Sequence, residues 1–350
     1  MRLIWSTNLR DPAFATEPIE SFATRMPYWY PAICLHLTHL GWDILRLGVR
    51  ESATPGRVAR AMRAFIPQLL YSYGGVTSWQ PIIARNRLRM DTPIIHGWDD
   101  YYDEIWRSCF TPIAGFFMRW LEGQVIRRSD YVMTISRYNQ ARAEAWGKRV
   151  WYIPNGCDVP RFDPALCSIR LEGDLKLVYV GDQAHYKRSD DILDAMVRLP
   201  PSIRLYIVGA PYPHVVDYAT RHPNIITLGR VSENDKWSVM AQADVLVCTA
   251  DQDCNAKFHE YLRMGKPILG YDGRPNLLFK NRRNALLTKD YYSAIRELQA
   301  SPILRETLAR NAVRDFQVLS WAETAQCYDV AFREIIDVWR ASHRRARLVQ

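Results

Sequence analysis

The sequence lacks the features of a membrane-spanning or secreted protein. It has no run of 18 or more uncharged apolar residues, so we expect no membrane-spanning helix. The N-terminal stretch MRLIWSTNLRDP has an apolar run too short for a signal peptide. The seven cysteines form neither a C-x-x-C pair nor a zinc-binding spacing, and such a scattered, odd set indicates reduced thiols. We therefore expect a cytoplasmic protein.

The sequence also has few lysines and no nucleic-acid-binding motif. Only eight of its 46 basic residues are lysine, and the formal net charge is +9. Such a charge favours an acidic partner, for example anionic lipid or a phosphorylated substrate, or it serves solubility alone. Two basic patches stand out: a helix face with Arg57, Arg60 and Arg63, and the C-terminal RASHRRARLVQ. Without a DNA- or RNA-binding pattern, we expect no nucleic-acid partner.

Apolar runs of strand length alternate with helical patterns along most of the chain. Predicted strands cover residues 2–6, 43–49, 80–86, 92–100, 130–136, 175–181, 203–209, 224–229, 244–249 and 266–271. Predicted helices cover residues 31–40, 54–72, 112–129, 189–199, 233–243 and 254–265, and the chain after residue 291 is expected to be helical. This alternation predicts an α/β fold with mostly parallel sheets.

Prolines and an Asn-Gly turn interrupt the alternation in RVWYIPNGCDVPRFDP. We therefore predict two doubly wound domains, residues 1–150 and 166–318, joined by a linker at residues 151–165. Residues 319–350 are predicted to form a C-terminal helix and the basic tail. Because ligands of open α/β sheets bind at the carboxyl ends of the strands, the cleft between two such domains is the expected binding site.

The stretch DQDCNAKFHEYLRMGKPILGY, residues 251–271, places a lysine and a glutamate near the start of a predicted helix. The N–H groups and partial positive charge of a helix N-terminus bind phosphate, and Lys257 would add a full charge. Glu260, one turn further, can accept hydrogen bonds from a ribose diol. The alternative is an (i, i+3) ion pair on a solvated helix face.

A second candidate is the loop after the predicted strand 175–181. Asp182, His185, Lys187 and Arg188 follow the strand end, and two cations there can clamp a diphosphate. Solvated loop charge is the alternative. The loop is not G-x-G-x-x-G, so the usual dinucleotide fingerprint is absent.

A third candidate lies in the first half of the chain, in IIHGWDDYYDE. His96 is predicted to end a buried strand, with Asp99 and Asp100 after it. A histidine and acids at a strand end suit proton transfer or binding of a polar substrate. The alternatives are a structural histidine and an acidic cap of the next helix.

These segments together resemble retaining glycosyltransferases of the GT-B fold, in particular glycosyltransferase family 4. YVMTIS and YIPNGCDVPRFDP resemble a strand and the linker of that family, and VYVGDQAHYKRSDDILDAM resembles its donor loop. LYIVGA, ITLGRVSENDKWSVMAQADVLVCTA, KFHEYLRMGKPILGY and LSWAETAQCYDVAF resemble later segments in the family order. The resemblance spans about residues 130–330, and the first 90 residues share only the rhythm of strands and helices.

The resemblance implies two Rossmann-like domains facing across a cleft, with a C-terminal helix that returns to the first domain. It implies metal-independent transfer of a sugar from a UDP- or GDP-sugar to a hydroxyl of a glycan or lipid-linked acceptor, without a cofactor. The acceptor would lie in the first domain, near Asp99 and Asp100, and the donor in the second. The implied donor-binding residues are Gly181, Asp182, Lys187, Arg188, Gly209, Arg230, Asn255, Lys257 and Glu260. The residues implied near the transferred sugar are His96, Gln252 and Asp253.

The sequence departs from the family in two places. Asp182 stands where the family usually has arginine, so Lys187 or Arg188 would carry more of the diphosphate charge. Gln252 stands where a glutamate usually approaches the sugar. This second departure favours one alternative function, that of a non-catalytic sugar-nucleotide-binding partner. A sugar-nucleotide epimerase, which can share this fold, is another alternative. The arginines of the two basic patches and the segment PIAGFFMRW allow two interpretations. They form a peripheral contact with a membrane, or they belong to an ordinary solvated surface.

Overall fold

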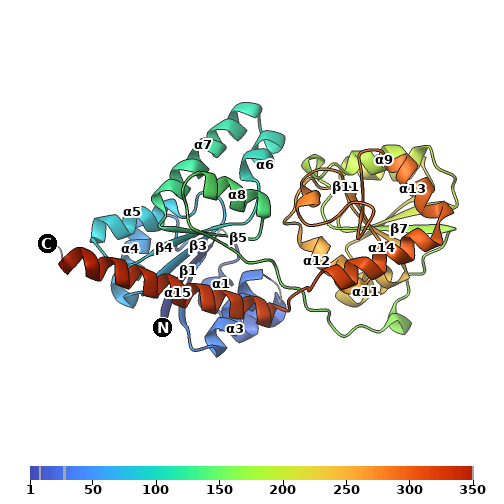
Figure 1. The fold of residues 1–350 in the computed structure, drawn as a ribbon. Coiled ribbons are helices and arrows are strands. Elements are labelled where there is room, and N and C mark those ends of the chain that lie inside the picture. The colour runs from blue at the N-terminus through green and yellow to red at the C-terminus, as the bar shows by residue number, and fades with distance from the viewer. Residues whose placement is uncertain (8, 27–28, 349–350) are drawn as a thin grey trace. The chain divides into compact units, whose positions relative to one another are not determined.

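The computed structural model describes residues 1–7, 9–26 and 29–348, and side chains up to residue 342. The chain forms two units, Met1–Gly156 with Leu319–Gln350, and Cys157–Val318. Each unit is a parallel six-stranded sheet with helices on both faces (Figure 1). The chain therefore has the predicted α/β class, with one doubly wound sheet in each unit.

The sheet of the first unit has the strand order β2-β1-β3-β4-β5-β6. Its strands are β1 Arg2–Thr7, β2 Asp43–Leu47, β3 Leu69–Tyr73, β4 Ile94–Trp98, β5 Tyr131–Thr134 and β6 Val150–Tyr152. Its helices are α1 Ala13–Thr16, α2 Ile19–Arg25, α3 Trp29–His39, α4 Pro55–Phe65, α5 Trp79–Leu88, α6 Tyr102–Cys109, α7 Pro112–Arg128, α8 Arg137–Ala145 and α15 Trp321–Leu348. α15 packs beside α3, although almost 300 residues separate them (Figure 1).

The sheet of the second unit has the order β12-β11-β10-β7-β8-β9. Its strands are β7 Leu175–Val180, β8 Ile203–Val208, β9 Ile225–Gly229, β10 Val245–Cys248, β11 Ile268–Tyr271 and β12 Leu286–Thr288. Its α-helices are α9 Ser189–Val197, α10 Pro213–Arg221, α11 Glu233–Gln242, α12 Ala256–Met264, α13 Tyr291–Ala300 and α14 Pro302–Asp315. Short 3₁₀ helices are η1 Pro164–Leu166, η2 His185–Lys187 and η3 Arg274–Leu277.

The buried cores explain why the strands read as continuous apolar runs. All five residues of β3 and of β4 are buried, as are five of the six residues of β7. Parallel strands covered on both faces need apolar side chains on both sides. An aromatic group from β1, β3 and α15, centred on Trp5, Tyr71 and Phe332, fixes the C-terminal helix against the first sheet.

Several predicted elements were wrong in type or extent. Residues 80–86 form part of helix α5 and not a strand, because a short apolar run does not by itself distinguish a buried strand from a buried helix face. The predicted helix 54–72 ends at Phe65, where Ile66 adopts φ +50° ahead of Pro67, and β3 follows. The predicted linker at 151–165 begins too early, since β6 takes its first two residues. Helices α8 and α10 and strand β12 were not predicted.

Candidate donor site

The second unit has its topological switch point at β7, which pairs with β8 on one side and with β10 on the other. The chain leaves β7 and β10 toward opposite edges of the sheet, so their carboxyl ends open a crevice at this point. The predicted donor residues come from the loops that follow β7, β8, β9 and β10 and from the first turn of α12. This sheet edge therefore assembles segments that lie about 80 residues apart.

Two glycines line the crevice, and the backbone at each position would be strained by a residue with a side chain. Gly181 has φ +127° and Gly209 has φ +133°, values that residues with a Cβ rarely adopt. A Cβ on Gly209 would lie 2.6 Å from the carbonyl oxygen of Gly181. A Cβ on Gly181 would meet only the Cε of Lys257, at 3.7 Å. The end of β7 thus lies directly beside the lysine of α12.

One lysine from α12 and one from α11 lie beside the same carboxylate, that of Glu260. Asn255 caps the helix by accepting a hydrogen bond from the Lys257 amide at 3.0 Å. The Lys257 Nζ lies 2.9 Å from Glu260 Oε1, and the Lys236 Nζ from helix α11 lies 3.7 Å from the same atom. Glu260 Oε2 is buried and has no hydrogen-bond partner in the described part of the chain. A hydroxyl donor from a ligand would satisfy this oxygen.

Lys257 and Glu260 therefore form the (i, i+3) pair that was the alternative interpretation of this stretch, but the pair is not a solvated one. Their side chains are 26% and 18% exposed. A surface pair has water around both partners. The third charged residue of this group, Lys236, was not identified from the sequence. Its position in the first turn of a helix at the same sheet edge could have indicated it.

The loop after β7 carries the second group of charges. Lys187 Nζ lies 3.6 Å from Asp182 Oδ2, and the Lys187 carbonyl accepts a 2.6 Å hydrogen bond from Thr249 Oγ1 at the end of β10. Lys187 and Lys257 both lower the pKa of Cys248, whose burial raises it to about 11. The two predicted diphosphate lysines thus lie near the same strand end.

Arg188 does not share the orientation of Lys187. It adopts φ +58°, which turns the chain sharply between η2 and α9. Its Nε donates to Asp191 at 2.8 Å, and its guanidinium lies 4.1 Å from the ring centre of Tyr271. Lys187 is therefore better placed than Arg188 to supply charge to the crevice.

The segment between β10 and α12 is more enclosed than the sequence indicated. Gln252 is 8% exposed and Asp253 1% exposed. Asp251 accepts a hydrogen bond from the Arg274 amide at 2.7 Å, and its carboxylate pairs with the Arg274 guanidinium at 3.4 Å. Arg230, another predicted donor residue, lies exposed after β9. The structure thus groups Gly181, Asp182, Lys187, Lys257 and Glu260, and leaves Gln252 and Asp253 largely covered.

His96 does not end its strand, which corrects the prediction from the sequence. It lies in the middle of β4 and has no exposed surface. Its Nδ1 is 2.7 Å from Ser78 Oγ, its Nε2 finds no partner among the described residues, and burial lowers its pKa to about 3. His96 is therefore neutral, and Nε2 would meet a ligand only if this part of the first unit opened.

Asp99, just beyond β4, lies among tyrosines. Burial and the neighbouring Asp100 raise its pKa to about 7, and Tyr102 donates a 2.9 Å hydrogen bond to its Oδ1. Burial raises the pKa values of Tyr30 and Tyr73, and the nearby Asp99 carboxyl raises them further. Asp100 instead accepts from the Tyr101 amide at 2.8 Å. A carboxyl surrounded by phenols can bind hydroxyl-rich ligands.

Comparison with known proteins supports the fold and the first unit separately. Residues 22–156 match the family model described as glycosyl transferase 4-like domain. No curated protein sequence matches the chain.

Solved structures match over nearly the whole chain. Sucrose-phosphate synthase from Thermosynechococcus elongatus has a TM-score of 0.75 at 14% identity, over 97% of this chain and 100% of that one. HepE from Anabaena in complex with UDP has a TM-score of 0.68 at 15% identity, over 95% and 100%. The lipopolysaccharide outer core galactosyltransferase WaaB has a TM-score of 0.64 at 13% identity, over 93% and 98%. The predicted GT-B fold is confirmed.

Proposed function

We propose that the protein is a retaining glycosyltransferase, because residues 22–156 match the model of the glycosyl transferase 4-like domain and the chain has the GT-B fold. It moves a sugar from a nucleotide-sugar, a UDP- or GDP-sugar, to a hydroxyl of a glycan or lipid-linked acceptor. The observation that carries this proposal is the group at α12, where two lysines flank Glu260 and one glutamate oxygen stays buried without a partner. HepE, which has the same fold, binds UDP and UDP-glucose in crystals.

In the proposed donor complex, Lys257 and Lys187 contact the diphosphate and Glu260 accepts from a ribose hydroxyl. The N–H groups of the first turn of α12 face the same anion. Gly181 and Gly209 let the backbone approach it closely. Negative charge develops on the diphosphate as the bond to the sugar breaks, so fixed positive charge there lowers the barrier to transfer. These lysines supply the charge without a metal or a cofactor.

The acceptor is proposed to bind in the first unit at Asp99 and Asp100. Asp99 exchanges a proton near neutral pH because burial raises its pKa to about 7. As a neutral carboxyl it can both donate to and accept from a sugar hydroxyl. His96, Gln252 and Asp253 stay predictions for contacts with the transferred sugar, and substitution of each by alanine would test them through the rate of transfer.

A thermal-shift screen with UDP, GDP, ADP and their sugars tests the donor. A ligand at 100 times its Kd adds about 2.7 kcal/mol to the free energy of unfolding. We expect one nucleotide to raise the melting temperature, and Lys257→Ala to remove most of that increase. Lys176→Ala is a matched control, because Lys176 has the same 26% exposure and pairs with Asp244 at the opposite sheet edge. No shift with any nucleotide would contradict the proposal.

Sugar transfer is separated from its alternatives by following the products. A transferase releases free nucleotide only when an acceptor is present, an epimerase interconverts donors without an acceptor, and a non-catalytic partner does neither. Radiolabelled donor with and without a candidate glycan therefore distinguishes the three. If an epimerised sugar nucleotide appeared in the absence of acceptor, the protein would be an epimerase and not a transferase.

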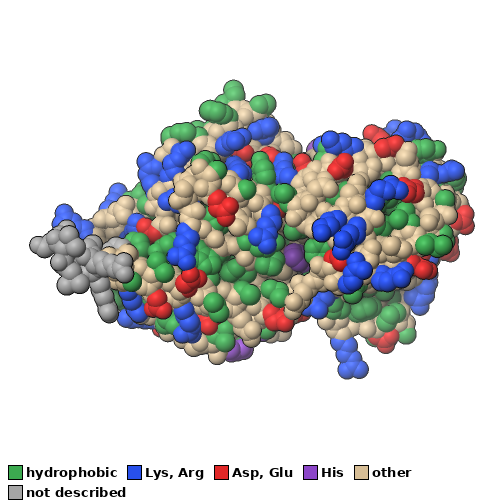
Figure 2. Space-filling model, in the orientation of Figure 1, with side chains coloured by type: hydrophobic (Ala, Val, Ile, Leu, Met, Phe, Trp, Pro, Cys, Tyr) green, Lys and Arg blue, Asp and Glu red, His purple; other side chains and the backbone are tan. Residues whose placement is uncertain are grey.

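We further propose that the first unit binds the surface of an anionic membrane. The described residues include no helix long and apolar enough to span one. Apolar side chains gather at the α6–α7 end of the first unit (Figure 2). The exposed members are Trp106, Phe110, Ile113, Phe116, Phe117 and Trp120, and we call this set the α7 patch. Residues 113, 116, 117 and 120 form one helical stripe, with the exposed Arg107 and Arg119 nearby.

Vesicle flotation tests this contact. The protein should float with phosphatidylglycerol-containing vesicles and less with phosphatidylcholine alone. The double variant Phe116→Ser/Trp120→Ser should stay in the soluble fraction, whereas Ile303→Ser, at an equally exposed apolar position of the second unit, should float like the wild type. Arg57, Arg60 and Arg63 are exposed on α4 and offer a second basic contact; the basic-tail side chains beyond residue 342 lie outside the described residues. Equal flotation of all variants would exclude the α7 patch.

A further inference from the structure

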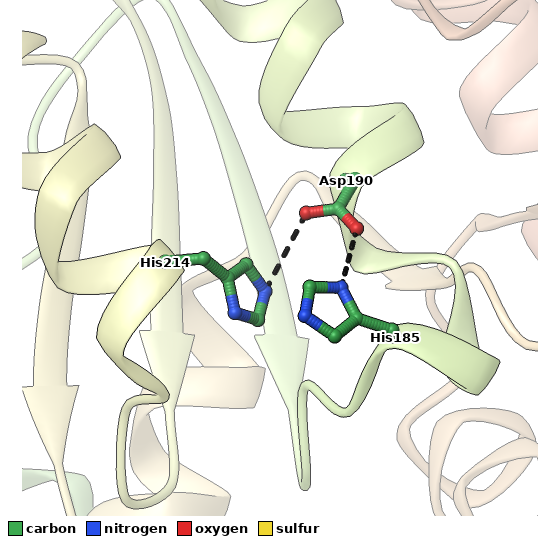
Figure 3. Close-up of side chains that lie close together, drawn as sticks. All are labelled: His185, Asp190 and His214. Carbon is green, nitrogen blue, oxygen red and sulfur yellow. Dashed lines mark hydrogen bonds and ion pairs between the residues drawn. The ribbon is translucent and has the colours of Figure 1, made fainter. Parts of the chain in front are cut away.

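Two histidines and an aspartate meet at the loop side of the second unit without being part of the proposed donor contacts. His185 comes from η2, Asp190 from the first turn of α9 and His214 from the first turn of α10 (Figure 3). His185 Nδ1 lies 2.9 Å from one Asp190 oxygen, and His214 Nε2 lies 3.5 Å from the other. We call these three residues the His-Asp-His cluster.

The backbone brings the cluster together by a local kink. Arg188 adopts φ +58° between η2 and α9, so the chain reverses and places His185 opposite Asp190, only five residues later. Pro213 starts α10 and sets His214 at its first turn. The two imidazole rings are stacked, with centroids 4.5 Å apart and an interplanar angle of 26°. Both rings therefore turn ring nitrogens toward the same carboxylate, as Figure 3 shows.

We propose that the His-Asp-His cluster binds a divalent transition metal ion of the zinc type. One ligand atom from each residue lies within 4.8 Å of the others. Bonds of about 2.0–2.2 Å in a tetrahedral site put neighbouring ligand atoms roughly 3.3 Å apart, so the three side chains would have to draw together to close around an ion. Imidazole nitrogen and carboxylate oxygen are ligands that zinc, cobalt and nickel accept.

The rest of the site suits an open coordination position. The His185 side chain is 68% exposed, so water or a ligand oxygen can take the fourth place. Asp190 can hold the ion through one oxygen while its other oxygen accepts a hydrogen bond. Ser189 Oγ lies 3.3 Å from His214 Nε2 but donates to the Gln183 carbonyl at 2.8 Å, so its proton does not compete for the metal position.

The proposed metal would add a link between three elements of the second unit. It would join η2 and α9 to α10 and so hold the loop that carries Lys187 and Arg188. This effect on the loop rests on the proposed donor site, whereas metal binding itself does not. The metal would organise the loop from outside the crevice and take no part in the sugar transfer.

Zinc titration of the untagged, reduced protein by calorimetry tests the site without any nucleotide. We expect one equivalent to bind, with the affinity reduced at least tenfold in His185→Ala and in His214→Ala. His222→Ala is the matched control, since His222 follows the same helix α10 outside the cluster and should bind zinc like the wild type. Bound cobalt should give the visible absorption of a tetrahedral site in the wild type and lose it in both cluster variants.

Three results would overturn the proposal. They are the absence of binding at micromolar zinc, equal affinity in the cluster variants and the wild type, and a cobalt spectrum that does not depend on His185 and His214. Far-UV circular dichroism of each variant shows that it is folded before its titration is interpreted. A nucleotide shift in the melting temperature that persists without metal would leave the transferase proposal standing even if the metal site failed.

Discussion

Glu122 lies on α7 with no exposed surface, so its environment opposes a charge. Trp98 donates a 3.0 Å hydrogen bond to its Oε1, and burial raises its pKa to about 8 from an ordinary value of 4.5. The nearby Asp103 raises it further, while Arg142 lowers it. The carboxyl is therefore protonated at neutral pH, and its neutral form fits this interior site.

Glu122→Gln should change how stability depends on pH. Between pH 4.5 and pH 8 the folded wild type holds a proton on Glu122 that the unfolded chain has lost, so its stability falls as the pH rises. At about 1.4 kcal/mol per pKa unit, the loss by pH 9 is at most about 5 kcal/mol. The glutamine variant has no proton to lose at this position, so its stability does not fall for this reason. Denaturant unfolding at pH 5 and pH 9 should show similar stability at the lower pH and a more stable variant at the higher one; a parallel dependence would contradict the assignment.

Glu260 belongs to the proposed donor site, and a ligand-binding measurement tests its role. Glu260→Gln keeps the shape but removes the carboxylate that two lysines flank. We expect UDP, or whichever nucleotide binds, to lose at least tenfold in affinity, because the variant no longer offers a charged acceptor to the ribose. Pyrophosphate, which has no ribose, should bind the variant at least as well as the wild type. If both ligands lost the same affinity, Glu260 would act on the diphosphate and not on the ribose.

At the scale of elements, the packing of α6 against α7 depends on one glycine. A Cβ on Gly115 would lie 2.7 Å from the Arg107 Cβ and 2.7 Å from the Asp103 carbonyl oxygen. The helix φ of this glycine is ordinary, so the constraint is the close approach and not the backbone conformation. The two helices and the α7 patch at their shared end therefore require a residue without a side chain at position 115.

Gly115→Val should separate the two helices. The added side chain has no space, and overpacking of this kind typically costs 1–3 kcal/mol. We expect a lower melting temperature and less flotation with anionic vesicles, because the α7 patch loses its arrangement. Gly56→Val is a control for size alone, since a Cβ on Gly56 meets nothing within 4 Å on the exposed side of α4. A variant at Gly115 as stable as the wild type would show that the helices tolerate separation.

At the scale of the whole molecule, each unit has its own sheet and cores. A donor bound as proposed contacts only the second unit. Hydrogen exchange with and without saturating nucleotide should therefore show new protection at residues 181–188 and in the first turn of α12. The first sheet should show no direct protection. Protection confined to the loop after β4, near Asp99, would place the nucleotide in the first unit and contradict the proposed roles.

Much of the architecture was predictable because parallel strands buried on both faces need apolar runs, and the chain repeats such runs between helices. β7, β8, β10 and β11 were predicted for this reason. The sequence did not show whether residues 80–86 form a strand or a helix, because a four-residue apolar segment fits either structure. The packing of α5 in the folded chain favours the helix. The GT-B fold was predicted from the order of motifs over residues 130–330, and the matching solved structures confirm it.

The amino-acid sequence was enough to predict the two α/β sheets, the proximity of Lys257 and Glu260 on one helix face, and the place of Lys187 on a strand-end loop. These follow from periodicity and from spacing along one segment. Contacts between residues of separate segments became visible in the folded chain alone. Folding brought Lys236 to Glu260, enclosed His96 inside β4 and joined His214 to His185, because such contacts depend on how separate elements pack and not on any local pattern.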